Sequence, residues 1–148
     1  MRAVVQRVRQ ASVMVDVEVV AEIGPGVVVL LGVAEDDTPD AAERMAGKVA
    51  RLRIFENEVG RFDRSLLDVS GEALVVSQFT LIADTRKGNR PSFTGAAESD
   101  VAEPVYERFC AALEDEGVRT ARGVFGARMQ VSLVNDGPVT IVLEAEPV

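Results

Sequence analysis

The sequence predicts a single α+β domain spanning residues 1–148, with a mostly antiparallel β-sheet or barrel and two main helices. Several separate segments alternate apolar and polar residues, as strands do when one face lies against a core. Two other segments repeat apolar residues at helical spacing. No repeat, linker or low-complexity segment divides the chain, and its length fits one domain.

The first third of the chain predicts three strands. Residues 2–8 and 12–23 alternate with period two and predict a hairpin. The continuous apolar run at 27–34 has the length of a strand and predicts a central strand. Because Gly and Pro favour turns, we expect residues 24–26, Gly-Pro-Gly, to form the turn before this strand.

Two segments predict helices. In residues 38–55, Thr38 is a typical N-cap and Pro39 suits the first helical position. Residues 99–117 predict the second helix. The only cysteine, Cys110, falls on its apolar side, and we expect a buried structural thiol rather than a nucleophile, because free Cys packs as a small hydrophobic residue.

The other segments predict strands and their connections. Residues 56–71 predict a hairpin or loop, 72–81 a strand, and 83–97 a long loop. The closing strands are expected at 118–123, 128–134 and 139–145.

The hexapeptide Asn-Asp-Gly-Pro-Val-Thr, 135–140, interrupts two good strand patterns. Proline cannot donate to a strand ladder and belongs at edges, bulges and turns. An ordinary hairpin turn explains these residues as well as a specialised site does. The hexapeptide alone does not decide between the two.

Composition excludes several classes of function. The absence of histidine removes the usual general base and metal ligand, and with them Ser-His-Asp and Cys-His arrangements, so we expect neither a metal nor another cofactor. A net charge of −8 argues against broad RNA or DNA binding. The longest apolar run, 26–34, is too short to cross a bilayer, and residues 1–10 lack the features of a signal peptide. We therefore expect a soluble cytoplasmic protein without a membrane partner.

A polar segment, Ser77-Gln78-Phe79-Thr80, ends an apolar strand pattern. One interpretation is an ordinary strand end. The other is a catalytic site, in which the backbone N–H groups of Phe79 and Thr80 form an oxyanion hole. Ser77 or Thr80 is a further candidate, as a nucleophile, but a hydroxyl nucleophile needs a base and no histidine is available.

Two more segments have both a structural and a functional interpretation. Arg86, Lys87 and Arg90 fall in one short loop, which is either simply solvated or contacts phosphates. Phe125 and Met129 are either core residues or the flat apolar wall of a pocket for a nucleobase.

Taken in order, the opening segment, Ser77–Thr80, residues 83–93 and residues 125–140 resemble the D-aminoacyl-tRNA deacylase family. The resemblance spans essentially the whole chain and includes two signature motifs, Ser-Gln-Phe-Thr and Asn-x-Gly-Pro-Val-Thr. One departure is Ile82, where many relatives have tyrosine. It lies just beyond the first motif and leaves the expected activity unchanged.

The resemblance implies a homodimeric hydrolase that proofreads chirality in translation. Such enzymes cleave the ester between a D-amino acid and the 3′-terminal adenosine of tRNA, and glycine mischarged on tRNA(Ala) is a further expected substrate. Gly137 and Pro138, joined by a cis peptide bond, are expected to enter the partner's active site, where their carbonyls receive the α-ammonium group and block an L side chain.

Among the remaining residues, Phe125 and Met129 are candidates for the pocket of the terminal adenine. Arg86, Lys87 and Arg90 are candidates for contacts with acceptor-stem phosphates. The vicinal ribose hydroxyl is expected to position the attacking water, and Thr80 to shape the pocket. Two alternatives are a non-catalytic dimer that binds nucleotides or RNA ends, and a general esterase with Thr80 as nucleophile.

Overall fold

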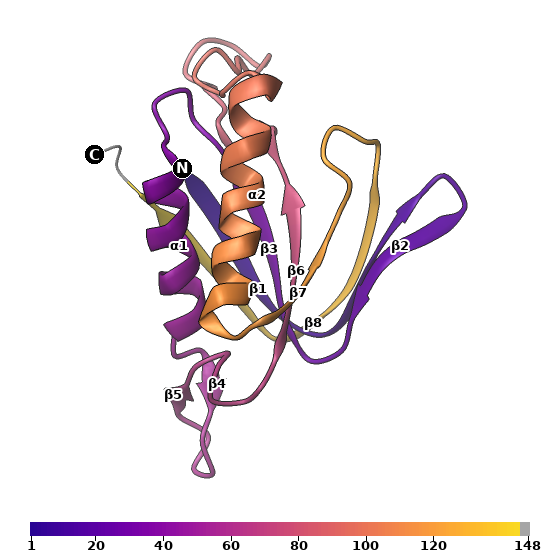
Figure 1. Cartoon of the computed structure of the whole chain (residues 1–148), viewed down its shortest axis with the longest axis vertical. Coiled ribbons are helices and arrows are strands. Elements are labelled where there is room, and N and C mark those ends of the chain that lie inside the picture. The colour runs from indigo at the N-terminus through magenta and orange to yellow at the C-terminus, as the bar shows by residue number, and fades with distance from the viewer. Residues whose placement is uncertain (146–148) are drawn as a thin grey trace.

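Two helices cover one face of a mixed β-sheet in the computed structural model, which describes residues 1–145 (Figure 1). The sheet contains six of the strands in this described range, in the order β2-β1-β3-β6-β7, with β8 paired to the other side of β1. The helices α1 (Pro39–Arg51) and α2 (Ser99–Glu116) lie side by side. Neither is long and apolar enough to cross a membrane.

The strands β1 (Arg2–Val15), β2 (Glu18–Ile23) and β3 (Gly26–Gly32) form one long antiparallel hairpin. The chain reverses at Asp16, whose φ of 55° is tolerated by a short polar side chain. The predicted break between residues 8 and 12 is therefore wrong. The predicted turn at residues 24–26 is also wrong, because β2 and β3 pair with β1 in the same direction and register, so these residues only separate two successive strands.

The remaining sheet strands are β6 (Glu72–Ser77), β7 (Arg119–Arg122) and β8 (Gln130–Glu144). The strand pairs β3–β6 and β6–β7 are parallel, whereas β8 is antiparallel to β1. Each parallel pair is joined through a helix, as parallel strands require. The short strands β4 (Phe55–Glu56) and β5 (Phe62–Arg64) form a separate hairpin. The predicted α+β fold is confirmed, and the two parallel pairs add to it.

The helix ends follow local chemistry. The Thr38 side chain accepts a hydrogen bond from the Ala41 N–H at 3.3 Å, which confirms the predicted N-cap. The helix α1 ends at Arg51 rather than near residue 55, because β4 begins at Phe55. The helix α2 ends at Glu116 and is capped by Gly117, whose φ of 103° lies in the region that favours glycine.

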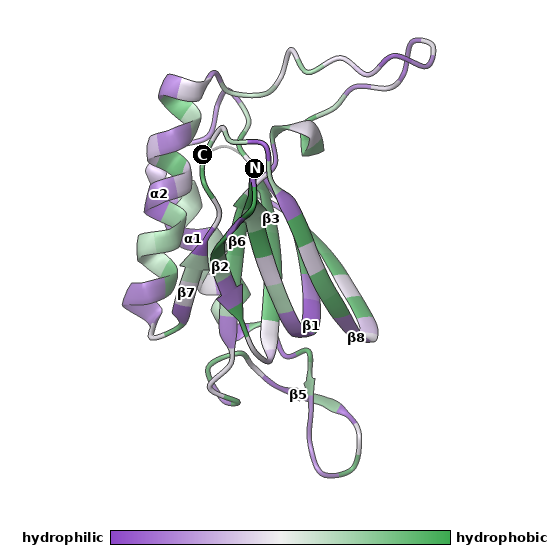
Figure 2. Cartoon of the chain, turned by 90° about the vertical axis from the view of Figure 1, so that its right-hand side faces the viewer, coloured by the Kyte–Doolittle hydropathy of each residue, from purple (hydrophilic) through white to green (hydrophobic). Residues whose placement is uncertain are grey.

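Two apolar cores stabilise the domain. The larger lies between the helices and one face of the sheet and includes Tyr106, Phe109 and Leu113. The smaller fills the opposite, curled face, where Leu133 of β8 and Ala121 of β7 pack against one cluster, so the sheet is barrel-like. Figure 2 shows the strands as largely hydrophobic. Each fully buried large apolar side chain contributes about 1.5–3 kcal/mol.

The strand β8 runs without interruption through residues 135–140, so an ordinary hairpin turn is not what this segment forms. Its register with β1 shifts here. Between the pairs Gln6↔Thr140 and Val8↔Asn135, β1 advances two residues and β8 advances five. The extra residues form a bulge, in which Gly137 and Pro138 are exposed. The sequence pattern showed the interruption but not its form.

Candidate functional site

A pocket of about 610 Å³ opens where β6 ends. Five of the predicted site residues line it: Ser77, Gln78, Phe79, Phe125 and Met129. The strand predicted for residues 72–81 ends at Ser77, and a 3₁₀ turn, η1 (Phe79–Leu81), follows. Apolar periodicity carries no signal for this change of backbone. Phe79, the first residue of this turn, lines the pocket, and Thr80 follows it without lining the pocket.

The backbone of η1 leaves two N–H groups free. The Gln78 N–H donates to the Leu31 carbonyl at 2.8 Å, and the Leu81 N–H donates to the Gln78 carbonyl at 3.1 Å. Between them, the N–H groups of Phe79 and Thr80 donate to no acceptor within residues 1–145. Two adjacent free donors at a pocket mouth are suited to hold the oxygen of a polarised carbonyl.

The hydroxyl of Thr80 has a neighbour that limits its chemistry. Its Oγ1 accepts a hydrogen bond from Nε2 of Gln78, and both side chains reach solvent. No group of three or more His, Cys, Asp or Glu residues suited to a metal occurs in the described range. Hydroxyl activation would need a base, and this contact supplies only a donor.

The apolar walls of the pocket are fixed by packing. The Phe79 ring meets the Phe93 ring edge-on, with 5.3 Å between the ring centroids. Met129 lies over Gly123, where an added Cβ would be 2.7 Å from its Sδ atom. Phe125 packs 5.7 Å, centroid to centroid, from Tyr106. These flat, apolar surfaces suit a nucleobase.

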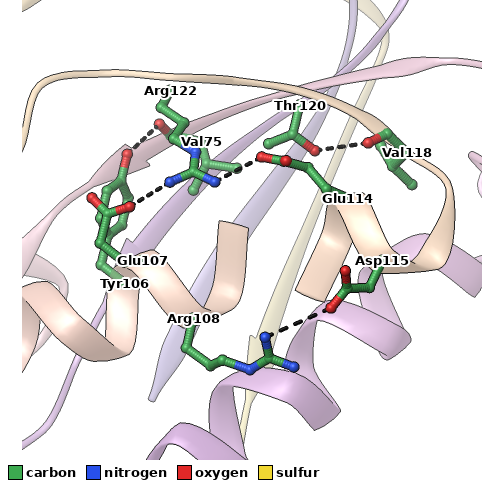
Figure 3. A network of polar contacts seen from close by, with 9 residues as sticks. All are labelled: Val75, Tyr106, Glu107, Arg108, Glu114, Asp115, Val118, Thr120 and Arg122. Atoms are coloured by element: carbon green, nitrogen blue, oxygen red, sulfur yellow. Dashed lines mark hydrogen bonds and ion pairs between the residues drawn. The ribbon is translucent and has the colours of Figure 1, made fainter. Parts of the chain in front are cut away.

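A polar network behind the pocket holds α2 against the sheet (Figure 3). The Tyr106 hydroxyl donates to the Val75 carbonyl at 3.0 Å, and Arg122 of β7 pairs with Glu107 and Glu114 of α2. Burial raises the pKa of the Tyr106 phenol, which therefore stays neutral. Burial likewise raises the pKa of the Cys110 thiol to about 12. The expectation of a buried structural thiol is confirmed.

The three basic candidates lie on the exposed loop between η1 and α2, which leaves the domain at the top of Figures 1 and 2. Arg86 forms hydrogen bonds with Asp84 at 2.7 and 2.9 Å. This contact holds the pKa of the Asp84 carboxyl at about 2. Lys87 and Arg90 form no ion pair within the described residues, so their charges face solvent.

The Gly137–Pro138 peptide bond is cis, and Arg7 supports the bulge that contains it. Nε of Arg7 donates to the Asp136 carbonyl at 3.0 Å, and Nη1 donates to the Ile54 carbonyl at 2.7 Å. Gly137 has a φ of 124°, and an added Cβ would lie 3.1 Å from Nη2 of Arg7. Only glycine fits this backbone and this contact without strain.

The dipeptide and the pocket lie near opposite ends of β3. Arg7 pairs with Val27 of β3, whereas Gln78 bonds to Leu31 of β3. Four residues of extended strand, roughly 13 Å, separate these two levels. Gly137 and Pro138 of one chain therefore do not line the pocket of that same chain.

Sequence reasoning missed several residues that shape the site. Phe93 and the start of α2, at Glu98 and Ser99, line the pocket, but they are distant in sequence from Ser77–Thr80. Arg7 falls in an alternating strand, where a basic residue normally faces solvent. Its contact with a residue 129 positions away leaves no local pattern.

Comparison with known proteins agrees with this geometry. The chain superposes with a TM-score of 0.85 on a solved structure described as "Structural Analysis of a probable eukaryotic D-amino acid tRNA deacylase", at 22% identity, covering 96% of this chain and 97% of that one. At that identity the likeness shows the fold alone. A second solved structure, described as "c-Myc DNA Unwinding Element Binding Protein", has a TM-score of 0.92 and 45% identity, with 99% of both chains covered.

The family model described as D-Tyr-tRNA(Tyr) deacylase matches residues 4–144, so the chain belongs to this deacylase family. A D-aminoacyl-tRNA deacylase of Chloroflexus aurantiacus is 59% identical over 145 residues, which covers 98% of this chain and 91% of the relative. One of Thermus aquaticus is 56% identical over 145 residues, covering 98% and 95%.

Proposed function

We propose that the protein hydrolyses the ester bond of D-aminoacyl-tRNA and releases a free D-amino acid and tRNA. The observation that carries the proposal is the pair of free N–H donors at Phe79 and Thr80, beside a pocket with flat apolar walls. Family membership makes the aminoacyl ester the substrate to place there.

In this mechanism the protein supplies charge stabilisation rather than a nucleophile. Water attacks the carbonyl carbon of the ester, and the developing oxyanion accepts hydrogen bonds from the N–H groups of Phe79 and Thr80. The intermediate then collapses, the bond between the acyl carbon and the ribose oxygen breaks, and that oxygen takes up the proton that the water loses. The adenine lies between Phe125 and Met129, and the vicinal ribose hydroxyl positions the water. An aminoacyl ester is already activated, so this site needs no histidine.

Chiral selection comes from the Gly137–Pro138 dipeptide of a second copy of the chain. Its backbone carbonyls receive the α-ammonium group of the substrate and occupy the direction of an L side chain. A D side chain points elsewhere, so the site excludes the wrong enantiomer by a clash and accepts many D-amino acids.

The distance between the pocket and the Gly137–Pro138 dipeptide supports a homodimer. The dipeptide lies on an exposed bulge, roughly 13 Å along the sheet from its own pocket. A joint site therefore takes the pocket from one chain and the bulge from the other. A two-fold arrangement, which is the commonest in homodimers, builds two such sites.

The remaining contacts are those of tRNA. Lys87 and Arg90 contact the acceptor-stem phosphates, because neither forms an ion pair within residues 1–145. A tRNA substrate places the protein with translation, in the cytoplasm. The net charge of −8 argues against broad binding along a nucleic acid, so we do not propose as a partner the DNA that the description of one structural relative names. A short basic loop can still contact one end of a tRNA.

The deciding experiment compares D-tyrosyl-tRNA with L-tyrosyl-tRNA under single-turnover conditions. We expect rapid release of D-tyrosine and near-complete survival of the L ester. Equal rates on both would contradict chiral selection. Binding of tRNA 3′ ends without turnover would favour the non-catalytic dimer. The same measurement with glycyl-tRNA(Ala) tests whether the achiral glycyl ester is also hydrolysed.

A further inference from the structure

The η1 turn is fixed to the sheet by Arg2 of β1, the strand that pairs with β3. Nη1 of Arg2 donates to the Leu81 carbonyl at 2.7 Å. Leu81 is the last residue of η1, so its carbonyl has no partner within the turn. A hydrogen bond from a charged donor to such a carbonyl is stronger than one between neutral groups.

The turn is thus held at three points. The Gln78 N–H bonds to the Leu31 carbonyl at its start, and Arg2 binds Leu81 at its end. Gly32 lies beneath it, where an added Cβ would come within 2.9 Å of Leu81 Cβ and 3.0 Å of the Gln78 carbonyl oxygen. The two free N–H groups lie between these points, so the contacts together set their direction.

Arg2 is itself oriented by a neighbouring strand. Its Nε and Nη2 each lie 2.9 Å from Oε1 of Glu144, the residue opposite it on β8. On its other side Arg2 pairs with Gly32 of β3. The guanidinium is therefore directed along the end of the sheet and towards η1 by the pairing of three strands.

We propose that Arg2 is a positioning residue, which aims the N–H groups of Phe79 and Thr80 through its bond to Leu81. This inference rests on the function proposed above. Donors of an oxyanion hole stabilise the transition state only when they are held in place before the reaction. Removing Arg2 lets the end of η1 move, while Phe125 and Met129, which lie outside η1, stay in place.

The test compares Arg2→Met and Arg2→Lys with a matched control, Arg108→Met. Arg108 is about as exposed as Arg2, at 36% against 39%, and also pairs with a glutamate, but it lies on α2 away from η1. We expect Arg2→Met to lower the single-turnover rate constant on D-tyrosyl-tRNA about tenfold. The half-saturation concentration should stay within about twofold of the wild-type value. Arg2→Lys keeps one charged donor and recovers part of the rate.

A second readout does not depend on turnover. Amide hydrogen exchange at Leu81 and Ile82, whose N–H groups bond within the turn, should accelerate in Arg2→Met and stay unchanged in Arg108→Met. A wild-type protein inactive on both esters would refute the proposed function, and the exchange rates would still test the position of η1. Unchanged amide exchange at Leu81 and Ile82 in Arg2→Met would overturn the role of Arg2. So would an unchanged single-turnover rate constant with only a higher half-saturation concentration.

Discussion

Nε of Arg7 lies 3.0 Å from the carbonyl oxygen of Asp136, the residue that precedes the Gly137–Pro138 dipeptide. Arg7 is buried, at 5% exposure, and its Nη1 also binds the Ile54 carbonyl. A single guanidinium therefore joins the β8 bulge to the segment that leads into β4. This gives the dipeptide a rigid support on the side away from solvent.

Replacing Arg7 by methionine should weaken both the fold and the activity. A buried carbonyl and a partly buried one lose a charged donor, and we expect the free energy of unfolding to fall by about 2–4 kcal/mol. Urea titration measures this change. Arg7→Lys should not restore activity, because an ammonium lacks the planar fork that reaches both carbonyls. Full D-ester hydrolysis in Arg7→Met would show that the bulge needs no such support.

Replacing Thr80 by alanine should leave substantial activity. The proposed mechanism uses the N–H of residue 80, which alanine retains, and loses only the side chain that accepts from Gln78. We expect less than about a tenfold fall in the single-turnover rate constant, compared with the 10²–10³ typical of a lost oxyanion donor. Mass spectrometry of the quenched wild-type reaction should reveal no aminoacyl-Thr80 adduct. Trapping one would favour the general esterase.

Lys87 and Arg90 should govern affinity for tRNA rather than chemistry. We expect the double variant Lys87→Gln/Arg90→Gln to raise half-saturation about tenfold without changing the maximal rate. The salt slope of binding should fall by roughly 1.4–1.8, the value for two lost phosphate contacts. Arg86→Gln is the matched control, because Arg86 already pairs with Asp84. A larger effect from Arg86 than from the double variant would reverse this assignment.

Alkaline pH should destabilise the fold through Cys110. Burial raises the pKa of its thiol to about 12, so folding favours the neutral form. The resulting stability is complete below the unfolded pKa, near 9.0, and is lost as pH rises towards 12. At pH 10 the loss is about 1.4 kcal/mol. Burial also raises the pKa of Tyr106, which adds to the loss of stability at higher pH. Arg122 has the opposite effect on the thiol, because its charge lowers the pKa of Cys110.

Urea midpoints measured from pH 7 to 10.5 check this pH dependence. The Cys110→Ala variant cannot ionise at this position, so its midpoint should fall less steeply than that of the wild type. Identical slopes in the two proteins would contradict the burial argument. Reaction of the native protein with a thiol reagent at pH 8 should be slow, because the thiol is both buried and neutral.

The sequence predicted the strand and helix patterns because periodicity records which face of an element is buried. It predicted Ser77, Gln78, Phe79, Phe125 and Met129 as site residues, and the structure brings these together at one pocket. Strand direction is not recorded in periodicity, so the parallel pairs of β6 were missed. The reversal at Asp16 was missed because residues 12–23 alternate through it without a break.

The features that the sequence did not predict depend on contacts between residues that are distant in sequence. Arg2 and Arg7 occupy ordinary positions of an alternating strand, and their roles appear only once Leu81 and Asp136 lie beside them. The bulge of β8 was visible as a proline within a strand pattern. Its form depends on the register with β1, which no local rule supplies.

The opposite placement of pocket and bulge has a genetic consequence in the proposed dimer. A chain with a damaged pocket still presents an intact bulge, and a chain with a damaged bulge still presents an intact pocket. Two inactive variants, one of each kind, would complement each other when mixed. Each mixed dimer would regain one of its two sites, and a cell expressing both alleles would recover proofreading that neither allele provides alone.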